Sequence, residues 1–336
     1  MRHDNLVFHN VGELFSDDSP GLRLQRVPES VRTCLNDRAE MRMLAPAATE
    51  IRFVTTSDRI TVTVSSEEGC ELIPFFGSLQ GKERIRVPDT PTEIEIARPE
   101  RLTQLDANTT AGFHFSPDVW RLTLRGNDVR YHGIKGENLR PPQSDELPSV
   151  RYLSYGTSIT HGAAATATHL TYVAQTAWRL GADLINLGVG GSAWCEPEIA
   201  DHIAGRDDWD VASLALSVNM IGAGFSDDEF RSRVRYVVEQ VAGKHPDKPV
   251  ACITIYPHFR DFGDGEEAEK SQRFRQILRD VCVELSLPNV RLIEGEALLS
   301  PAGLSVDMIH PGDLGMIQMG EGLANHLSQM MREMGK

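Results

Sequence analysis

The sequence lacks the features that mark several common classes of protein. Its first ten residues, MRHDNLVFHN, contain no apolar run as long as a secretion signal, so none is expected. No stretch approaches the roughly 18 apolar residues of a membrane span, so we expect no membrane partner. The five cysteines are scattered and form no Cys-x-x-Cys pair. This pattern predicts neither a disulfide framework nor a zinc site and favours a reducing, cytoplasmic location.

Positive charge is also scarce in this chain. Its 34 lysines and arginines are outnumbered by 48 aspartates and glutamates, which gives a formal net charge of −14. Nucleic acids are bound mainly by basic surfaces, so no nucleic-acid partner is expected. The eleven histidines form no His-Glu-x-x-His motif, and we expect no metal and no other cofactor. The charge does not argue against a neutral substrate such as a sugar ester.

The first part of the chain has the residue pattern of an all-β domain. With 336 residues the chain is longer than one ordinary domain, so two domains are expected. Residues 1–140 contain short β-rich runs bounded by Gly, Pro, Asp or Asn, which predict a jelly-roll-like β-sandwich. A polar segment with three prolines follows, and we place a linker at 141–149. The predicted strands are Ile51–Thr55, Ile60–Val64, Glu71–Phe76, Arg84–Val87, Glu93–Ile96 and Trp120–Leu124.

The spacing of apolar residues along the chain changes over residues 150–336. Five apolar runs alternate with segments whose apolar residues recur every three or four positions, which is typical of helices with one buried face. This alternation predicts an α/β domain, a doubly wound five-stranded parallel sheet of flavodoxin-like type. The helical patterns cover 170–178, 230–241, 274–285 and 316–330. The predicted strands are Arg151–Tyr155, Leu184–Val189, Ala212–Val218, Val250–Tyr256 and Val290–Glu294.

Two segments carry residues suited to nucleophilic catalysis. The first strand of the sheet ends in YGTSITHG, so Ser158 follows a strand at its carboxyl end, where sites in such sheets gather. Near the end of the chain, Asp307 and His310 stand three residues apart. A serine hydroxyl becomes a strong nucleophile only when a base takes its proton and a carboxylate orients that base. Taken singly, Ser158 is equally well explained as a helix cap and the Asp-His pair as a surface loop.

Two further strand ends carry hydrogen-bond donors. Residues 186–192 read NLGVGGS, and residues 217–220 read SVNM. Acyl transfer needs donors directed at the oxyanion of the transition state. A glycine lets its backbone N–H come close to a substrate, and the side chain of Asn219 offers an NH2 group. The simpler explanation of both segments is a tight turn.

In their order along the chain, these four segments resemble the conserved blocks of the SGNH (GDSL-type) hydrolase superfamily. The resemblance runs from the first strand of the sheet to the last helix. It implies that Ser158 is the nucleophile and that Asp307 and His310 complete a catalytic triad. It also implies an oxyanion hole made by the N–H groups of Ser158 and Gly191 and by the side chain of Asn219.

The chain departs from the usual family pattern at two places. Thr157 stands where the first block usually has Asp, and Ser217 and Met220 stand where Gly-x-Asn-Asp is common. Neither change removes a catalytic group, but both bear on the subgroup and the pocket. The YGTSITHG motif, together with a β-rich N-terminal domain, resembles the pattern of a subgroup of this superfamily that contains esterases and an acyltransferase.

Three other polar or aromatic residues near these segments are candidates for a role in the site. Trp194, His161 and Tyr256 are candidate substrate-binding residues, although each is equally well explained as structural. Gly188–Ala193 also fits the dinucleotide fingerprint G-x-G-x-x-A, with an aspartate at 207–210 as the ribose-binding acid. That fingerprint belongs to the first strand–helix turn of a domain, whereas this turn is the second, so a dehydrogenase is disfavoured.

We therefore predict a serine esterase that forms an acyl-serine intermediate on short acyl esters, such as acetyl groups on a carbohydrate or small molecule. One alternative is an acyltransferase that uses the same acyl-enzyme. The other is a catalytically inactive carbohydrate-binding protein. The first domain is expected to cap the active site, to bind a polymer or to form a homo-oligomer interface, and the sequence does not choose among these.

Overall fold

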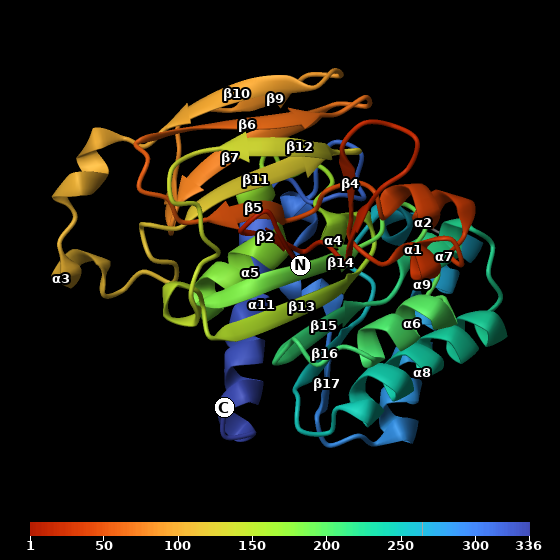
Figure 1. The fold of residues 1–336 in the computed structure, drawn as a ribbon. Helices are drawn as coiled ribbons and strands as arrows, with labels where there is room; N and C mark the ends of the chain where they lie inside the picture. Colours follow the sequence, from red (N-terminus) through yellow and green to blue (C-terminus); the bar gives the residue numbers. More distant parts are fainter. Residues whose placement is uncertain (264) are drawn as a thin grey trace. The chain divides into compact units, whose positions relative to one another are not determined.

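The computed structural model describes residues 1–263 and 265–336, and the chain divides into two compact units (Figure 1). The first unit contains Met1–Ser30 and Met41–Ser149. The second contains Val150–Lys336 together with Val31–Glu40, a segment that carries no sequence signal for this unit. No helix in the described part of the chain is both long and apolar enough to cross a membrane.

The first unit consists of two antiparallel sheets with a shared core, which confirms the predicted all-β arrangement. One sheet has the order β1-β2-β5-β11-β7-β8, with β9 paired to β7, and the other has the order β10-β6-β12-β4-β3. The strands of the first sheet are β1 Arg2–His3, β2 Leu6–His9, β5 Thr49–Phe53, β7 Cys70–Phe76, β8 Leu79–Gln80, β9 Ile85–Val87 and β11 Trp120–Gly126. Those of the second are β3 Glu13–Phe15, β4 Leu22–Gln25, β6 Arg59–Ser65, β10 Thr92–Ala97 and β12 Arg130–Lys135.

Alternating side chains explain how these strands form a core. In β6 the residues Ile60, Val62 and Val64 are buried, and polar residues point the other way between them. The opposite sheet contributes Trp120, whose ring packs against Phe53 and Phe76. Three short helices also occur within residues 1–149, and none was predicted, because each is too short for a periodic pattern. They are α1 Glu29–Arg32, α2 Asp37–Arg42 and α3 Ala107–Thr110.

The second unit contains the predicted five-stranded parallel sheet. Its strand order is β14-β13-β15-β16-β17. Two strands end three residues earlier than predicted, and two others end one residue earlier. β15 ends at Ala215, because Val218 already begins a helix, and β16 ends at Ile253. The strands are β13 Val150–Gly156, β14 Ala182–Gly188, β15 Val211–Ala215, β16 Val250–Ile253 and β17 Val290–Ile293.

Helices cover both faces of this sheet (Figure 1). On one face α5 packs against α11, and on the other α8 packs against both α6 and α9. The apolar stripes seen in the sequence face the sheet; in α8, for example, Phe230, Val234 and Val238 are buried. The main helices are α5 Tyr172–Leu180, α6 Pro197–Ala204, α8 Asp227–Lys244, α9 Glu266–Leu285 and α11 Asp313–Glu333.

The strand order of this sheet has a topological switch point at β13. β13 lies between β14 and β15, so the chain first runs to one side of β13 and then to the other. Such a switch point leaves a crevice beyond the carboxyl ends of the strands. The turns after β13, β14 and β15 meet there, and they carry Ser158, Gly191 and Asn219.

Candidate active site

Ser158 is the first residue of the four-residue helix α4, Ser158–His161, directly after β13. Thr157 caps this helix, because its hydroxyl accepts a hydrogen bond from the N–H of Ile159 at 3.3 Å. α4 lies directly on the end of β14: a side chain at Gly188 would come within 2.3 Å of the His161 backbone nitrogen. The close packing of the turn on β14 thus fixes the position of the serine.

Ser158 is joined to His310 and Asp307 by two hydrogen bonds. Its Oγ lies 2.8 Å from Nε2 of His310, and Nδ1 of His310 lies 2.6 Å from Oδ2 of Asp307. The carboxylate can only accept a hydrogen bond, so Nδ1 carries the proton and Nε2 presents its lone pair to the serine hydroxyl. The tautomer is the one that a general base for Ser158 requires.

A tight loop before α11 holds Asp307 in place. Its Oδ1 accepts hydrogen bonds from the N–H groups of Ile309 and His310 and from the hydroxyl of Ser305, each at 2.9 Å. Met308, at φ +55°, makes the turn, and the Ser305 N–H closes it on the His310 carbonyl at 2.7 Å. Sequence reasoning missed Ser305, because an isolated serine in a loop carries no signal.

The electrostatics keep Asp307 ionised. Partial burial by itself would raise the pKa of this carboxyl, but the hydrogen bonds from the ring and backbone of His310, from Ile309 and from Ser305 hold it well below its ordinary value. Asp307 therefore carries its negative charge at any pH at which an ester assay is run.

Asn219 lies in the short helix α7, Val218–Gly222, rather than at a strand end. Its Oδ1 accepts the N–H of Ala193 at 3.2 Å, and this bond turns the NH2 group the other way. The hydroxyl of Ser217 donates to the carbonyl of the same residue, Ala193. The serine that replaces the usual family glycine therefore helps to fasten the turn after β14 to the turn after β15.

Gly191 has a backbone conformation that favours glycine, with φ +77°. In the part of the chain that the structure describes, no group accepts its N–H, and none accepts the NH2 group of Asn219. The N–H of Ser158 opens a helix and so has no partner within that helix. Three turns at neighbouring strand ends thus present donors that the described residues do not satisfy.

The three candidate substrate-binding residues make other contacts. Nδ1 of His161 lies 3.2 Å from the carbonyl of Gly188, an arrangement that holds α4 on β14. The ring of Trp194 packs against Phe225, and the ring of Tyr256 packs against Tyr172. Among the described residues, the side chains of Trp194, His161 and Tyr256 make no hydrogen bond to Ser158 or His310. Their role in substrate binding stays a prediction.

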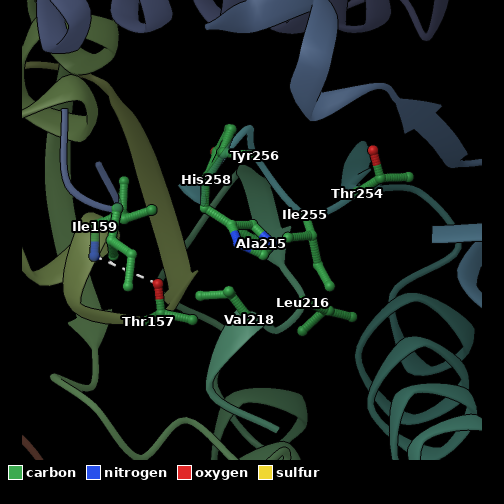
Figure 2. Close-up of a pocket in the computed structure, with 10 residues that line it drawn as sticks. Thr157, Ile159, Ala215, Leu216, Val218, Thr254, Ile255, Tyr256 and His258 are labelled. Carbon is green, nitrogen blue, oxygen red and sulfur yellow. Dashed lines mark hydrogen bonds between the residues drawn. The ribbon is translucent and has the colours of Figure 1, made fainter. Parts of the chain in front are cut away.

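A small pocket borders the turn that contains Thr157 and Ser158 and the turn that contains Ile309 and His310 (Figure 2). It offers a solvent-accessible volume of about 10 Å³, room for about one water molecule. Neither Ser158 nor His310 lines it, so the pocket lies beside the reacting groups rather than at them. Its wall is mostly apolar and consists of Thr157, Ile159, Ala215, Leu216, Val218, Thr254, Ile255, Tyr256, His258 and Ile309.

His258, in the wall of this pocket, belongs to a loop that contacts the turn carrying Asp307 and His310. The next residue, Phe259, donates its N–H to the carbonyl of Met308 at 2.7 Å, which ties this loop to the Asp307–His310 turn. Asp261 accepts the His258 N–H at 3.0 Å, and Arg275 holds the Asp261 carboxylate with two bonds of 2.7 Å. Sequence patterns do not predict this network, because its members are scattered polar residues.

The burial of His258 predicts a pH-dependent stability. The ring is 1% exposed, and burial, aided by Arg275 and Arg260 against the opposing effect of Asp261, lowers its pKa to about 4. Between pH 6.5 and about 4 the unfolded chain binds a proton here that the folded chain does not, so stability falls as the pH falls through that window. The loss attributable to this ring is on the order of 3 kcal/mol.

Thermal unfolding between pH 7 and pH 4.5 measures this effect. The fall in Tm over that range should be smaller for His258→Gln than for the wild type, whatever the Tm of the variant at pH 7. His114, an exposed histidine, supplies the control variant His114→Gln, whose slope should match the wild type. Equal slopes for His258→Gln and the wild type would show that this ring does not control acid stability.

The structure also bears on the dinucleotide alternative. In that motif the glycine-rich turn opens a helix directly, so that the helix N-terminus meets the pyrophosphate. Here α6 begins only at Pro197, after a further loop, and Gly188–Ala193 lies on the second strand of its unit. The turn is built to meet Ser217 and Asn219 instead.

Comparison with solved structures finds the same fold over nearly the whole chain. A salicylyl-acyltransferase, SsfX3, from a tetracycline biosynthetic pathway has a TM-score of 0.76 at 18% identity, covering 97% of this chain and 95% of its own. A family two carbohydrate esterase from Cellvibrio japonicus has a TM-score of 0.66 at 13% identity, with coverage of 98% and 96%. An acetyl xylan esterase, Est2A, from Butyrivibrio proteoclasticus has a TM-score of 0.60 at 11% identity, with coverage of 99% and 96%.

No curated protein matches the sequence. The model of the GDSL-like Lipase/Acylhydrolase family matches residues 151–328, which is most of the second unit and more than half of the chain. The match confirms the resemblance that the four sequence blocks indicated. The chain therefore belongs to the GDSL-like lipase/acylhydrolase family, and it is a serine esterase of that family.

Proposed function

We propose that this chain hydrolyses short acyl esters, such as acetyl groups on a carbohydrate or small molecule, through an acyl-Ser158 intermediate. The observation that carries the proposal is the hydrogen-bonded chain from Ser158 through His310 to Asp307. A hydroxyl, a base in the required tautomer and an ionised carboxylate are the parts that acyl transfer to serine needs.

The proposed reaction proceeds in two halves. Nε2 of His310 takes the proton of Ser158 as Oγ attacks the ester carbonyl carbon, and the carbonyl oxygen becomes an oxyanion. When the intermediate collapses, the bond to the alcohol breaks and His310 returns the proton to that alcohol. In the second half, His310 takes a proton from water, the water attacks the acyl-serine, and the acid and free Ser158 are released. Asp307 stabilises the imidazolium in both halves without taking its proton.

We assign the oxyanion hole to the N–H groups of Ser158 and Gly191 and to the NH2 group of Asn219. The unsatisfied donors at these three turns support the assignment, because buried or half-buried N–H groups in folded proteins nearly always have a partner. Donors fixed in advance stabilise the developing charge without reorganising during the reaction.

Loss of the Asn219 donor should be costly. Asn219→Ala is expected to lower kcat/KM for ester hydrolysis by about 100- to 1000-fold, because one preorganised oxyanion donor is removed. The matched control is Ser217→Ala, which removes the neighbouring bond to Ala193 but no proposed donor. Steady-state kinetics on the same ester should show a much smaller loss for Ser217→Ala. Comparable losses in the two variants would mean that Asn219 acts by holding the turn rather than by binding the oxyanion.

The proposed function is tested with p-nitrophenyl acetate, butyrate and octanoate and with an acetylated xylo-oligosaccharide. The proposal expects turnover that is fastest with acetate and release of free acetate from the saccharide. An enzyme that prefers the octanoate would contradict the assignment of short acyl esters. An enzyme that prefers the acetate but leaves the acetylated saccharide intact would exclude this carbohydrate and point to an ester of a small molecule. The acetyl xylan esterase and the family two esterase among the structural neighbours support this choice of substrate.

Acyl transfer to an alcohol is the second candidate, and the likeness to a salicylyl-acyltransferase favours it. Both reactions use the same acyl-enzyme and differ in whether water or a bound alcohol attacks it. Product analysis distinguishes them. A transferase forms a new ester when an acceptor sugar is added and hydrolyses the donor slowly in its absence, whereas a hydrolase releases the acid at the same rate in both conditions.

A further inference from the structure

A short segment from the first part of the sequence belongs to the catalytic unit. Val31–Glu40 groups with this unit, and Asn36 anchors it there. The Asn36 side-chain amide donates to the carbonyl of Ser192 at 3.1 Å and to the carboxylate of Glu196, both in the loop after β14. The side-chain oxygen Oδ1 of Asn36 caps α2 by accepting the N–H of Ala39 at 3.1 Å. The start of α2 is therefore fixed against the loop that also contains Gly191.

This anchoring brings Arg38 onto Gly191. The position that a Cβ atom would occupy at Gly191 lies 2.7 Å from Cζ, 2.8 Å from Nη2 and 2.9 Å from Nε of Arg38. The guanidinium thus covers the face of Gly191 that a side chain would fill. The positive φ favours glycine at this position, and the absence of a side chain leaves room for the guanidinium to lie against the backbone.

Arg38 has no partner among the residues that the structure describes. Its side chain is exposed, and within residues 1–263 and 265–336 no residue forms a hydrogen bond or an ion pair with it. Two acids of these segments have other partners, since Glu196 binds Asn36 and Glu40 pairs with Arg32 at 3.0 Å. The adjacent Asp37 is exposed, and no described contact joins it to Arg38. A guanidinium with five donors therefore stands beside a proposed oxyanion-hole glycine, in a protein with a net charge of −14.

We propose that Arg38 binds a carboxylate carried by the substrate next to the scissile ester, so that the preferred substrates are esters with a negative charge. The inference rests on the proposed function, because it takes Gly191 to be part of the oxyanion hole. A planar guanidinium matches a carboxylate with two parallel hydrogen bonds, which an acetyl ester of a neutral sugar would leave unused.

The geometry assigns Arg38 to the flank of the substrate rather than to the oxyanion itself. At a tetrahedral Cα the direction of a Cβ atom diverges from the direction of the backbone nitrogen, and Arg38 lies on the Cβ side of Gly191. A substrate whose carbonyl oxygen meets the Gly191 N–H would therefore place a neighbouring group, and not that oxygen, against the guanidinium. Arg38 is in this sense a specificity residue.

Two pairs of esters test the proposal and locate the charge. In the first pair, mono-p-nitrophenyl glutarate carries a carboxylate on the acyl group and its methyl ester does not. In the second pair, 4-acetoxybenzoate carries the carboxylate on the alcohol part and methyl 4-acetoxybenzoate does not. The wild type should prefer the charged member of one pair. In Arg38→Gln the charged-to-neutral ratio of kcat/KM in that pair should fall about 10- to 100-fold, mainly through KM.

The pair that responds identifies the part of the substrate that carries the charge. Arg38→Lys should recover part of the ratio, and Arg273→Gln, a half-exposed arginine on α9 that pairs with Asp227, should leave it at the wild-type value. Ratios that do not change in Arg38→Gln for either pair would overturn the proposal. Equal losses on charged and neutral esters would also overturn it, because Arg38 would then act on the oxyanion or on the position of Gly191.

A binding measurement separates this proposal from the proposed function. The ligand matches the pair that responds: monomethyl glutarate for the acyl side, or 4-acetoxybenzoate for the alcohol side. It is titrated by calorimetry into Ser158→Ala and into the same protein with Arg38→Gln added, so that turnover plays no part. The proposal expects at least a tenfold weaker Kd in the double variant. An equal Kd, or no binding to Ser158→Ala, would overturn the role of Arg38, whereas a wild type that hydrolyses none of the four esters would contradict the proposed function.

Discussion

Replacing Ser158 with alanine should lower kcat/KM for p-nitrophenyl acetate on the order of 10⁵- to 10⁶-fold. The methyl group cannot form the acyl-enzyme, so only binding and the oxyanion donors remain to assist attack by water. The hydroxyl is half-buried and lies 2.8 Å from its base in this structure, so its loss removes the reacting atom while little of the packing changes. Steady-state assays and the burst of p-nitrophenol in the first turnover measure the effect.

The control for this variant is Ser149→Ala, an exposed serine just before β13, which should keep the wild-type rate. Ser158→Ala should also lose the covalent acetyl adduct that mass spectrometry detects when the wild type is quenched during turnover. A variant that keeps a tenth or more of the wild-type rate would mean that the reaction does not pass through Ser158.

Much of the fold was predictable, because it depends on local patterns. The five parallel strands are mostly apolar runs, and the helices between them show one buried face each, so both appear in the sequence. β12 was missed because its residues, RYHGIK, are mostly half-exposed and a register shift between Tyr131 and Gly133 breaks the alternation. The order of strands in each sheet depends on contacts far apart in the chain, which local patterns do not contain.

In the candidate site, too, some residues were predictable from local motifs and others were not. Ser158, Asp307 and His310 were named from short motifs, and the structure brings their side chains within hydrogen-bond distance. Asn36 and Arg38 were not named, since they meet the loop after β14 only through folding, more than 150 positions along the chain. No spacing rule connects such residues, and an arginine in a charged segment ordinarily indicates a solvated surface.

Replacing Asp307 with asparagine should lower kcat about 10⁴-fold although the side chain keeps its size. The carboxylate accepts four hydrogen bonds here: one oxygen binds Nδ1–H of His310, and the other binds two backbone N–H groups and the Ser305 hydroxyl. An amide has only one acceptor oxygen. The three donors on one side will hold that oxygen, so the NH2 group must face the ring.

This arrangement changes the tautomer of His310. A ring nitrogen that faces an NH2 group must accept, so the proton moves to Nε2, and Nε2 then has no lone pair for the Ser158 hydroxyl. Ser305→Ala removes only one of the three donors and leaves the pair between Asp307 and Nδ1 intact, so its loss in kcat should be far smaller. Thermal unfolding of both variants reports whether the loop stays folded. If Asp307→Asn keeps a rate within tenfold of Ser305→Ala, Asp307 does not set the tautomer, and His310 is oriented by the loop backbone alone.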